Sequence, residues 1–329
     1  MWKLAARPQG DLKDSDLSWH EEPVGELADG EVLVQVGWLS LDPTNRVWMN
    51  ETPTYLPPVG LGDVMRGTGL GRVVESRHPE YPVGALVSGL LGWQSHARLR
   101  PDGLFVHDPA LPFSDEEYLG LINHIGATAF FGVRDVARVK PGDTFVVSAA
   151  AGAVGSLAGQ IARLEGARVV GIASTPEKCR WLVDELGFDA AIDRRAEDIG
   201  PALDRTCPRG IDVYFDNVGG AILDACLKRA RIGGRIAVCG LISQYNAAKP
   251  PAGPSYFGNV VTRRLRIEGF LVLDYAARFP EAYSQLAAWA RDGKLRYRLD
   301  VVDGLERAVA GLRRLFDGDN IGKLVVRVA

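Results

Sequence analysis

The sequence TFVVSAAAGAVG, residues 144–155, joins a short apolar segment to a turn rich in alanine and glycine. The apolar segment has the length of a buried strand, and the spacing from Ala150 to Gly155 is A-x-G-x-x-G. Gly152 would let a pyrophosphate approach the backbone, and Gly155 would let the next helix pack close to the strand. The N-terminus of that helix offers free N–H groups to an anion. The stretch therefore predicts a dinucleotide-binding turn, with a tight strand–helix turn that binds nothing as the alternative.

Strands and helices are expected to alternate on both sides of this turn. Pro176 suits the first turn of its helix, because the N–H that it lacks would have no partner there. Near-continuous apolar strands that alternate with helices indicate a parallel sheet covered on both faces, in a doubly wound α/β domain. The predicted strands are residues 144–148, 168–173, 190–192, 211–216, 234–239 and 266–272, and the predicted helices are 155–165, 176–186 and 221–230.

The chain before residue 115 has a different pattern, in which short strands are separated by glycine and proline turns. Residues 31–36, 71–75 and 84–88 are the clearest of these strands. Short strands at such close spacing predict a small β-rich, barrel-like domain. Ser114 to Glu117 then has the pattern of a capping box, which predicts the start of a helix.

The tail of the chain is assigned to this β-rich domain. Helices are expected at 279–291 and 305–316, the second ended by Gly318, with extended chain at 296–301 and a strand at 323–328. We therefore expect a discontinuous catalytic domain and one cofactor domain between its two parts. The predicted limits are residues 1–126 and 298–329 for the catalytic domain and 127–297 for the cofactor domain.

The end of the second parallel strand distinguishes NADPH from NADH. An acid that binds the ribose 2′-hydroxyl is expected about 20 residues beyond the glycine turn. Here the strand ends at Ala173, and Ser174 follows in place of an acid. Lys178 comes next on a predicted helix, and Arg194 and Arg195 follow the third strand. Hydroxyl and cationic groups suit a 2′-phosphate, so we expect NADPH; each cation has the alternative of a solvated surface position.

Composition excludes several other classes of protein. The net charge of -3 gives no electrostatic reason to expect nucleic-acid binding. No apolar run approaches the ~20 residues that a membrane helix needs, and the N-terminus lacks the apolar core of a signal peptide, so we expect a cytoplasmic protein. All four cysteines lie at residue 179 or beyond, none at metal-ligand spacing. We therefore expect reduced cysteines and no zinc site.

Four further motifs are spread along the chain: LSLDP at 39–43, DNVGG at 216–220, CGLISQYN at 239–246 and GDNIGK at 318–323. Together they resemble the medium-chain dehydrogenase/reductase family, in its zinc-free branch of prostaglandin reductases, leukotriene dehydrogenases and bacterial curcumin reductases. The resemblance implies a GroES-like catalytic domain beside the cofactor domain. It also implies NADPH-dependent reduction of the carbon–carbon double bond of α,β-unsaturated ketones or aldehydes, by hydride transfer to the β-carbon without a metal.

The resemblance also implies roles for individual residues. Tyr245 is expected to donate a hydrogen bond to the enolate oxygen, directly or through the cofactor ribose, because a phenol stays protonated at working pH. Its alternative role is packing against the cofactor. The residues expected to hold NADPH are Thr128, beside the carboxamide, with Gly152, Ala153, Val154, Gly155, Ser174, Lys178, Arg194, Asn217, Cys239, Gly240, Ile242, Ser243, Tyr245, Phe270, Leu271, Val272 and Asn320.

The expected substrate pocket departs from the family pattern. The tyrosine that usually follows LSLDP is Thr44 here, so an aromatic wall is expected to be missing. The stretch NHIG at 123–126 replaces Gly-Met-Pro-Gly and adds polarity. A tyrosine of the mammalian and plant members is Thr262 here, and Tyr256 is considered as its substitute. The residues assigned to this pocket are Thr44, Asn45, Arg46, His124, Tyr256 and Thr262.

Three functions remain open at this point. We favour an enone or enal reductase that acts as a homodimer on a small-molecule substrate. A quinone reductase or a hydroxyl dehydrogenase is the second, and an NADPH-binding protein without catalytic activity is the third. The departures at the substrate pocket leave the substrate itself undetermined, since a likeness at family level does not define it.

Overall fold

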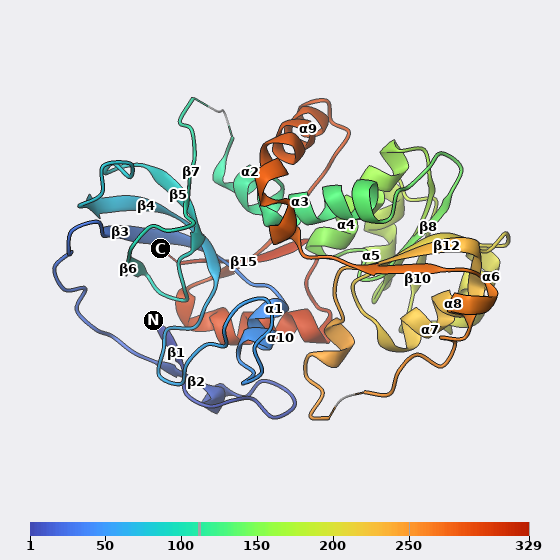
Figure 1. Ribbon diagram of the computed structural model, residues 1–329, viewed down its shortest axis with the longest axis horizontal. Helices are drawn as coiled ribbons and strands as arrows, with labels where there is room; N and C mark the ends of the chain where they lie inside the picture. Colours follow the sequence, from blue (N-terminus) through green and yellow to red (C-terminus); the bar gives the residue numbers. More distant parts are fainter. Residues whose placement is uncertain (111–112, 250, 329) are drawn as a thin grey trace.

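The computed structural model describes residues 1–110, 113–249 and 251–328. Figure 1 shows two halves side by side, one containing most of the N-terminal strands and the other a parallel sheet covered by helices. The C-terminal strand β15 (Lys323–Arg327) and helix α10 (Ala308–Asp317) return from the second half to the first. No helix within the described ranges is long and apolar enough to cross a membrane.

The second half contains a six-stranded sheet in the order β10-β9-β8-β11-β12-β13, and every neighbouring pair is parallel. This confirms the doubly wound α/β class. The strands are β8 (Thr144–Val147), β9 (Arg168–Ala173), β10 (Ala190–Asp193), β11 (Ile211–Asp216), β12 (Ala230–Val238) and β13 (Arg266–Gly269). The helical segments between them are α4 (Ala153–Leu164), α5 (Pro176–Arg180), the π-helical η3 (Trp181–Glu185), α6 (Ile199–Thr206), α7 (Gly220–Arg229), the 3₁₀ turn η4 (Ile242–Gln244) and α8 (Asn259–Thr262).

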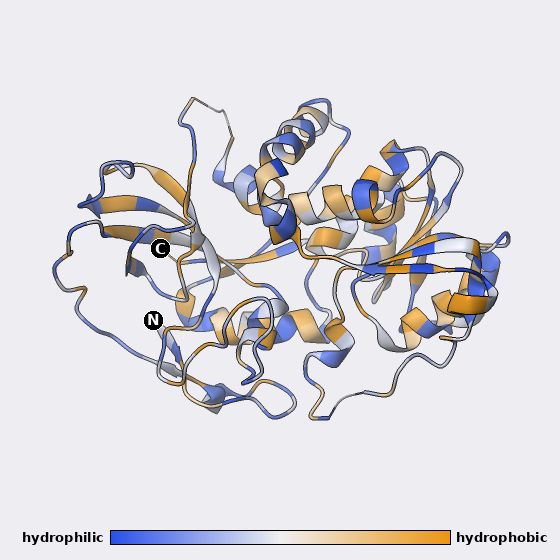
Figure 2. Ribbon diagram, in the orientation of Figure 1, coloured by the Kyte–Doolittle hydropathy of each residue, from blue (hydrophilic) through white to orange (hydrophobic). Residues whose placement is uncertain are grey.

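Successive residues of these strands are buried on opposite faces of the sheet. Phe145 and Val147 of β8 belong to a core shared with α3 (His124–Phe131), α4 and α9 (Phe279–Arg291). Val146, between them, belongs to a second core shared with α6 and α7. Strands buried on both faces need apolar side chains at almost every position. Figure 2 shows much orange among the strands of this half, with blue between the orange stretches on the front strands β12 and β13.

The first half contains a seven-stranded mixed sheet in the order β14-β15-β3-β4-β5-β7, with β6 paired to β3. β15 pairs with β3 in antiparallel register, Val325 opposite Ser40, so the tail completes the sheet begun by the N-terminal part. The strands other than β15 are β3 (Val32–Ser40), β4 (Thr68–Ser76), β5 (Leu86–Leu90), β6 (His96–Leu99), β7 (Phe105–Val106) and β14 (Leu299–Asp303). The remaining segments of the chain are β1 (Trp2–Leu4), η1 (Asp14–Asp16), β2 (Leu17–Trp19), α1 (Thr44–Trp48), α2 (Asp115–Gly120), η2 (Gly132–Val136), η5 (Val272–Arg278) and η6 (Leu305–Arg307).

Several local predictions are confirmed and one strand is shorter than predicted. Ser114 caps α2 with the expected capping box, and Gly318 ends α10 in the left-handed conformation. The strand predicted over 266–272 ends at Gly269. Gly269 pairs with Val238, the last residue of β12, so the chain beyond it has no neighbouring strand to pair with. The chain after Gly269 therefore leaves the sheet.

Candidate active site

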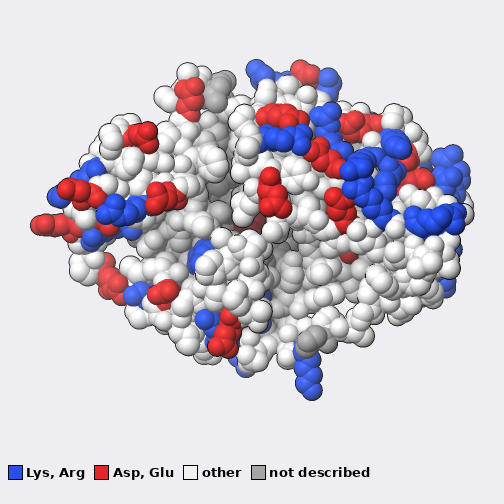
Figure 3. Space-filling view, viewed as in Figure 1, with Lys and Arg blue, Asp and Glu red and all other residues white. Residues whose placement is uncertain are grey.

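The carboxyl ends of the parallel strands open onto a cleft of about 1210 Å³. Asn217, Cys239 and Phe270, which directly follow β11, β12 and β13, all line it. Thr44 and Trp48 of α1 line it from the other half of the molecule. Figure 3 shows a hollow between the two halves bordered mainly by uncharged surface. This edge of an open α/β sheet is where such folds bind their ligands.

The glycine turn after β8 leaves backbone N–H groups facing this cleft. Gly152 is the N-cap of α4 and no side chain caps the helix, so the first N–H groups of the helix are available to an anion. Ala149 has φ of 46°. A Cβ on Gly155 would lie 2.3 Å from the Ala149 carbonyl oxygen, so the turn closes only around glycine. The arrangement fits a bound pyrophosphate.

A cluster of cations and a hydroxyl surrounds Gly318, where α10 ends. The buried Lys178 donates hydrogen bonds from Nζ to the Gly318 carbonyl oxygen at 2.7 Å and to Ser174 Oγ at 3.3 Å. A side chain at position 318 would meet Ser174 Oγ at 3.4 Å, Arg194 Nη2 at 3.6 Å and Arg195 Nη2 at 3.8 Å. Burial, with the neighbouring Arg195, lowers the pKa of Lys178. These donors converge on one point and fit a dianionic phosphate.

The loop of residues 318–322 connects this cluster to the glycine turn. The Gly322 N–H donates to the Ala151 carbonyl oxygen at 2.7 Å, and Asn320 Nδ2 donates to the Gly322 carbonyl oxygen at 3.0 Å. The sequence motif indicated Asn320, which does line the cleft. The motif did not indicate that the Gly318 carbonyl oxygen accepts hydrogen bonds from both Lys178 Nζ and Ser174 Oγ.

Most of the residues expected to hold NADPH line the cleft, and four do not. One of the four is Ser243, whose hydroxyl donates to the Val218 carbonyl oxygen at 2.6 Å. Ser174, Lys178 and Arg194 lie in the cluster around Gly318, beyond the cleft wall. The expected residues that line the cleft are Thr128, Gly152, Ala153, Val154, Gly155, Asn217, Cys239, Gly240, Ile242, Tyr245, Phe270, Leu271, Val272 and Asn320.

Asp216, at the end of β11, orders the loop that carries Asn217. Its Oδ1 accepts hydrogen bonds from the N–H groups of Val218 and Gly219 at 2.9 and 2.8 Å and from the Tyr214 hydroxyl at 2.7 Å. Burial raises the pKa of Asp216 above its ordinary value. Its Oδ2 has no hydrogen-bond partner among the described residues, so a proton carried there would disturb no existing contact.

Tyr245 lines the cleft and is held by its own loop. Its hydroxyl oxygen accepts a hydrogen bond from the Leu241 N–H at 3.0 Å. Burial raises the pKa of Tyr245, so the phenol is protonated at neutral pH. Its hydroxyl hydrogen has no acceptor in the described part of the chain, and it is therefore available to a ligand.

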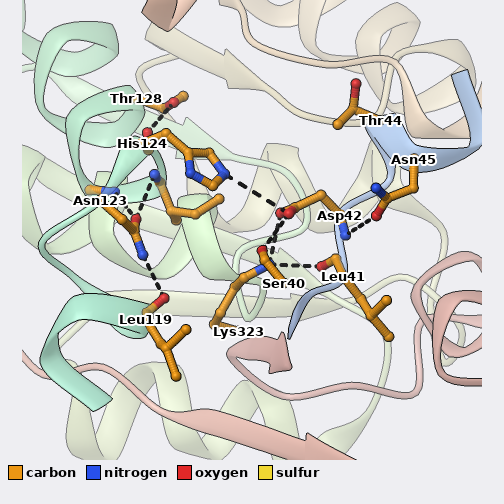
Figure 4. Close-up of polar contacts among 12 residues, drawn as sticks. Ser40, Leu41, Asp42, Thr44, Asn45, Leu119, Asn123, His124, Thr128 and Lys323 are labelled. Atoms are coloured by element: carbon orange, nitrogen blue, oxygen red, sulfur yellow. Dashed lines mark hydrogen bonds and ion pairs between the residues drawn. The ribbon is translucent and has the colours of Figure 1, made fainter. Parts of the chain in front are cut away.

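Figure 4 shows a buried polar cluster in which Lys323 of β15 and His124 of α3 both face Asp42. Lys323 Nζ lies 2.8 Å from Asp42 Oδ1 and also donates to the Leu41 carbonyl oxygen at 2.7 Å. His124 Nε2 lies 3.9 Å from Asp42 Oδ2, and 33% of its side chain remains exposed to the cleft. Burial lowers the pKa of His124 although Asp42 opposes this, so the ring is a neutral polar group in the cleft wall.

Four of the six residues assigned to the substrate pocket do not line the cleft in this structure. Asn45 and Arg46 are 1% and 2% exposed and line no part of the cleft. Successive residues of a helix point about 100° apart, so Thr44 of α1 faces the cleft while the next two face the interior. Tyr256 and Thr262 lie outside the cleft wall as well; Tyr256 packs under Lys228, and Thr262 is exposed on α8.

Tyr55 is one of the residues lining the cleft that were not expected from the sequence. Tyr55, in the loop after α1, lines the cleft, and its hydroxyl contacts Thr44 Oγ1. An isolated tyrosine in a proline-rich loop carries no periodic signal, so nothing in the sequence separated it from other surface tyrosines. Only the fold brings this loop over α1.

Metal ligands were not expected from the sequence. Within the described ranges, no three His, Cys, Asp or Glu side chains come together in a way that could hold a metal ion. His107 also lines the cleft, but it shares a hydrogen bond of 2.8 Å with Ser88 Oγ, and burial lowers its pKa to about 4. The absence of a metal remains a prediction.

Comparison with known proteins matches both halves of the chain. Residues 1–106 match a family described as the N-terminal domain of oxidoreductase, and residues 153–289 match one described as zinc-binding dehydrogenase. The chain is 41% identical to the NADPH-dependent curcumin reductase of Escherichia coli strain K12, covering 100% of this chain and 96% of that protein. It is 38% identical to rat prostaglandin reductase 1, covering 99% and 98%.

A solved structure of a curcumin-reductase relative is also similar to this chain over its whole length. The crystal structure of CurA in complex with NADPH, from Vibrio vulnificus, superposes with a TM-score of 0.95 at 39% identity and covers 100% of this chain and 98% of that one. Similarity of this extent includes both halves and the cleft between them. The chain therefore belongs to the medium-chain dehydrogenase/reductase family, in the branch of the curcumin, alkenal and prostaglandin reductases.

Proposed function

We propose that this protein is an NADPH-dependent reductase of carbon–carbon double bonds conjugated to a ketone or aldehyde. The observation that carries the proposal is that one cleft joins the free N–H groups of the glycine turn to the protonated hydroxyl of Tyr245. The full-length identity of 41% to an NADPH-dependent curcumin reductase supports the same activity.

Bound NADPH supplies the hydride that adds to the β-carbon of the substrate. The N–H groups of Ala153 and Val154, free at the start of α4, would bind its pyrophosphate. Ser174, Lys178 and Arg194, which surround Gly318, would bind its 2′-phosphate. Tyr245 donates a hydrogen bond to the carbonyl oxygen, where negative charge develops. The Leu241 N–H holds the Tyr245 oxygen at 3.0 Å, so this donor is oriented before the substrate arrives. The α-carbon then takes a proton from water or from a hydroxyl in the cleft.

The proposal includes a homodimer. β13 is the last strand of the parallel sheet, and its outer edge is unpaired among the described strands. Ile267 on this strand and Val261 and Leu273 beside it are 36%, 79% and 50% exposed. An open strand edge with apolar neighbours favours association with a second copy. Light scattering after size-exclusion chromatography tests this, and a monomer at micromolar concentration would remove the dimer from the proposal.

Two further parts of the proposal concern organisation and location. We place the domain limits after residues 126 and 297, since strands from 32 to 106 and from 299 to 327 share one sheet and strands from 144 to 269 share the other. A cytoplasmic location is supported by four cysteines that are free thiols in this structure, as a reducing compartment would keep them.

The test is a substrate panel with the purified protein, followed by loss of NADPH absorbance and by mass spectrometry of the products. We expect turnover of an enone and an enal to the saturated carbonyl compounds, with NADH a poorer donor than NADPH. Turnover of quinones alone would replace the proposal by a quinone reductase. NADPH binding without turnover of any compound would replace it by a non-catalytic binding protein.

A further inference from the structure

We propose that Asp11 is a positioning residue for Tyr245 and that it acts through Asn246. The inference rests on the proposed function, in which the Tyr245 hydroxyl donates a hydrogen bond to the substrate carbonyl oxygen. Asp11 lies in the N-terminal loop and is not part of the cleft wall. Its role follows from the way in which the loop that carries Tyr245 is attached to the two halves of the molecule.

The loop of residues 241–246 is attached at its start to its own half. The N–H group and the hydroxyl of Ser243 both donate to the Val218 carbonyl oxygen, at 3.2 and 2.6 Å. The Leu241 N–H donates to the Tyr245 hydroxyl oxygen at 3.0 Å. All of these groups belong to the parallel-sheet half, so they do not fix the position of Tyr245 relative to the other half.

At its end, the same loop is attached to the other half. Asn246, directly after Tyr245, donates from Nδ2 to Asp11 Oδ1 at 2.9 Å. Figure 1 shows the dark blue N-terminal loop beside the light orange chain that follows η4. Among the described residues, no other hydrogen bond joins residues 1–110 to residues 144–297. Tyr245 therefore stands between one attachment to each half of the molecule.

The backbone around Asp11 is fixed, although its side chain is exposed. Leu12, the next residue, is 5% exposed and packs in the core of the first half. Arg313 of α10 donates from Nε to the Leu12 carbonyl oxygen at 3.0 Å and also pairs with Asp14. On the other side, Gly10 has φ of 82°, a conformation that favours glycine. The Asp11 carboxylate thus extends from a well-anchored turn.

The two side chains are complementary hydrogen-bonding groups. An ionised carboxylate only accepts hydrogen bonds and the amide nitrogen only donates them, so the contact holds the Asn246 amide in one orientation. Asp11 forms no ion pair within the described ranges, and the neighbouring Arg313 pairs with Asp14 instead. Asn246 Oδ1 is buried and has no partner in the described part of the chain. Asp11 is therefore the group that orients this amide.

Loss of the contact should act on the reaction through Tyr245. A donor to the developing enolate contributes most in the transition state, so a poorly placed Tyr245 lowers kcat and kcat/KM together and leaves KM unchanged. No hydrogen bond among the described residues links Asp11 or Asn246 to the glycine turn or to the cluster around Gly318. The affinity for NADPH should therefore be unchanged.

The first experiment compares Asp11→Ala with the wild type in the reduction of 3-penten-2-one by NADPH. We expect kcat to fall about five-fold, in the range of one hydrogen bond, with the KM for the enone and the Kd for NADPH unchanged. Amide hydrogen exchange over residues 241–249, measured without substrate, should become faster. Gln9→Ala is the matched control, because Gln9 is exposed in the same loop, and it should change neither kcat nor the exchange rates.

A double-mutant cycle tests whether Asp11 acts through the tyrosine hydroxyl. Tyr245→Phe removes the donor, so the addition of Asp11→Ala to this variant should lower kcat no further. If Asp11 only stabilised the fold, Asp11→Ala would lower kcat by the same factor with and without the hydroxyl.

An exchange of the two partners tests the contact itself. Asn246→Asp places two carboxylates opposite each other and should lower kcat at least as much as Asp11→Ala does. Asp11→Asn in that background restores one amide and one carboxylate with their places exchanged. We expect kcat to rise again about three-fold over Asn246→Asp alone, in the range of one hydrogen bond.

The outcomes separate this inference from the proposed function. If the wild type reduces no enone, the proposed function fails, and equal exchange rates over residues 241–249 in the wild type and in Asp11→Ala would then overturn the inference as well. If the wild type reduces enones and Asp11→Ala leaves kcat unchanged, only the inference is overturned. Independent effects of Asp11→Ala and Tyr245→Phe, or no recovery in the exchanged pair, would also overturn it.

Discussion

The wall of the cleft that we propose for the cofactor and the wall that we propose for the substrate are held in shape by different means. The cofactor wall is made of strand ends and a turn whose backbone conformation admits only glycine at Gly155. The substrate wall is made of side chains on a five-residue helix, α1, and on the loop of Tyr55. Backbone geometry fixes the first wall and side-chain contacts fix the second, so single substitutions should act on them differently.

The two walls also treat buried charge differently. In the substrate wall, Asp42 is paired with Lys323 at 2.8 Å, and both side chains are buried. In the cofactor wall, Asp216 is buried with no cation as a partner and is satisfied by backbone N–H groups and hydroxyls instead. A buried carboxyl without a cation favours its protonated form, whereas a paired one favours its ionised form. Substitutions in the two walls should therefore differ in their effect on stability and in their dependence on pH.

Gly155→Ala should disrupt the cofactor wall most strongly. The added Cβ would lie 2.3 Å from the Ala149 carbonyl oxygen and 3.0 Å from Ala150 Cα, and both are backbone atoms that cannot rotate away. We expect the free energy of unfolding to fall by about 3 kcal/mol, measured by urea denaturation. Gly253→Ala is the control, since a Cβ there meets no atom within 4 Å. A loss at Gly155 below about 1 kcal/mol would mean that the turn is not fixed by its backbone.

Arg46→Met should destabilise the substrate wall without changing its chemistry. Arg46 is 2% exposed and donates to the carbonyl oxygens of Pro8 and Gly10, both at 3.1 Å, and to Asn50 Oδ1 at 2.6 Å. Methionine keeps the length of the side chain and leaves these acceptors without donors, so we expect a loss of about 2 kcal/mol in the free energy of unfolding.

The kinetic constants decide whether Arg46 has a structural role alone. For Arg46→Met, kcat/KM at a temperature where the variant is folded should match the wild type within about two-fold, well inside the range of one weak hydrogen bond. The exposed Arg205, paired with Glu197, gives the control Arg205→Met, which should lose no more than about 0.5 kcal/mol. A large selective loss of enone turnover in Arg46→Met would show that Arg46 contributes to substrate binding, as expected from the sequence.

The same contrast explains how much could be predicted from the sequence. β9 and β11 begin and end at the predicted residues, or within one residue of them, because burial on both faces demands an unbroken apolar run. The glycine turn could be predicted because its backbone admits only glycine at Gly155, which leaves a recognisable spacing in the sequence. β13 was predicted too long, since Phe270 to Val272 are apolar for a different reason: they line the cleft instead of pairing in the sheet.

The substrate wall was predicted less well, and for physical reasons. Asn45 and Arg46 follow Thr44 directly, but the turn of α1 points them inward. Thr262 was chosen because it stands where relatives have a tyrosine, and Tyr256 was chosen as its substitute, but neither residue lines the cleft. Tyr55 reaches the cleft through a loop whose path depends on the Arg66 contacts with Trp48 and Pro57, and such long-range contacts leave no local pattern.

Lys178→Met should weaken the preference for NADPH over NADH, because it removes one positive charge from the proposed 2′-phosphate site. Lys178 Nζ lies in the cluster around Gly318 with Ser174, Arg194 and Arg195. A hydrogen bond to a charged group contributes about 1.5–3 kcal/mol, so we expect the ratio of NADH to NADPH dissociation constants to fall at least ten-fold. The ratio is the proper readout, because the loss of the contact with the Gly318 carbonyl oxygen affects both cofactors. Lys294→Met, on the exposed surface, should leave the ratio unchanged. An unchanged ratio in Lys178→Met would place the 2′-phosphate elsewhere.

Asp216→Asn should have the smallest effect on stability and the clearest dependence on pH. Asparagine resembles the protonated carboxyl and can accept the same hydrogen bonds through its own Oδ1 from Val218, Gly219 and Tyr214. The amide nitrogen would replace Oδ2, which has no partner among the described residues. We therefore expect a change in the free energy of unfolding within about 1 kcal/mol of zero near acid pH.

The sign of the pH dependence follows from the raised pKa of Asp216, whose largest cause is burial. A raised pKa means that the folded protein binds this proton more tightly than the unfolded chain does. The stability that it contributes is greatest below the ordinary pKa of an aspartate and is lost as the pH rises through the pKa of the folded state. Asparagine does not titrate, so Asp216→Asn should gain stability relative to the wild type as the pH rises above about 4, the ordinary pKa of an aspartate.

For Asp42 on the substrate wall, we expect the stability to change with pH in the opposite direction. Burial would raise the pKa of Asp42, but the charge of Lys323, together with hydrogen bonds from Lys323 and Ser40, holds it below its ordinary value. The stability that this carboxylate contributes is therefore present above the ordinary pKa of an aspartate and is lost as the pH falls, so Asp42→Asn should lose stability relative to the wild type as the pH rises. Urea unfolding of both variants across this pH range measures the two slopes. Slopes of the same sign would show that the two walls do not hold their buried carboxyl groups in different charge states.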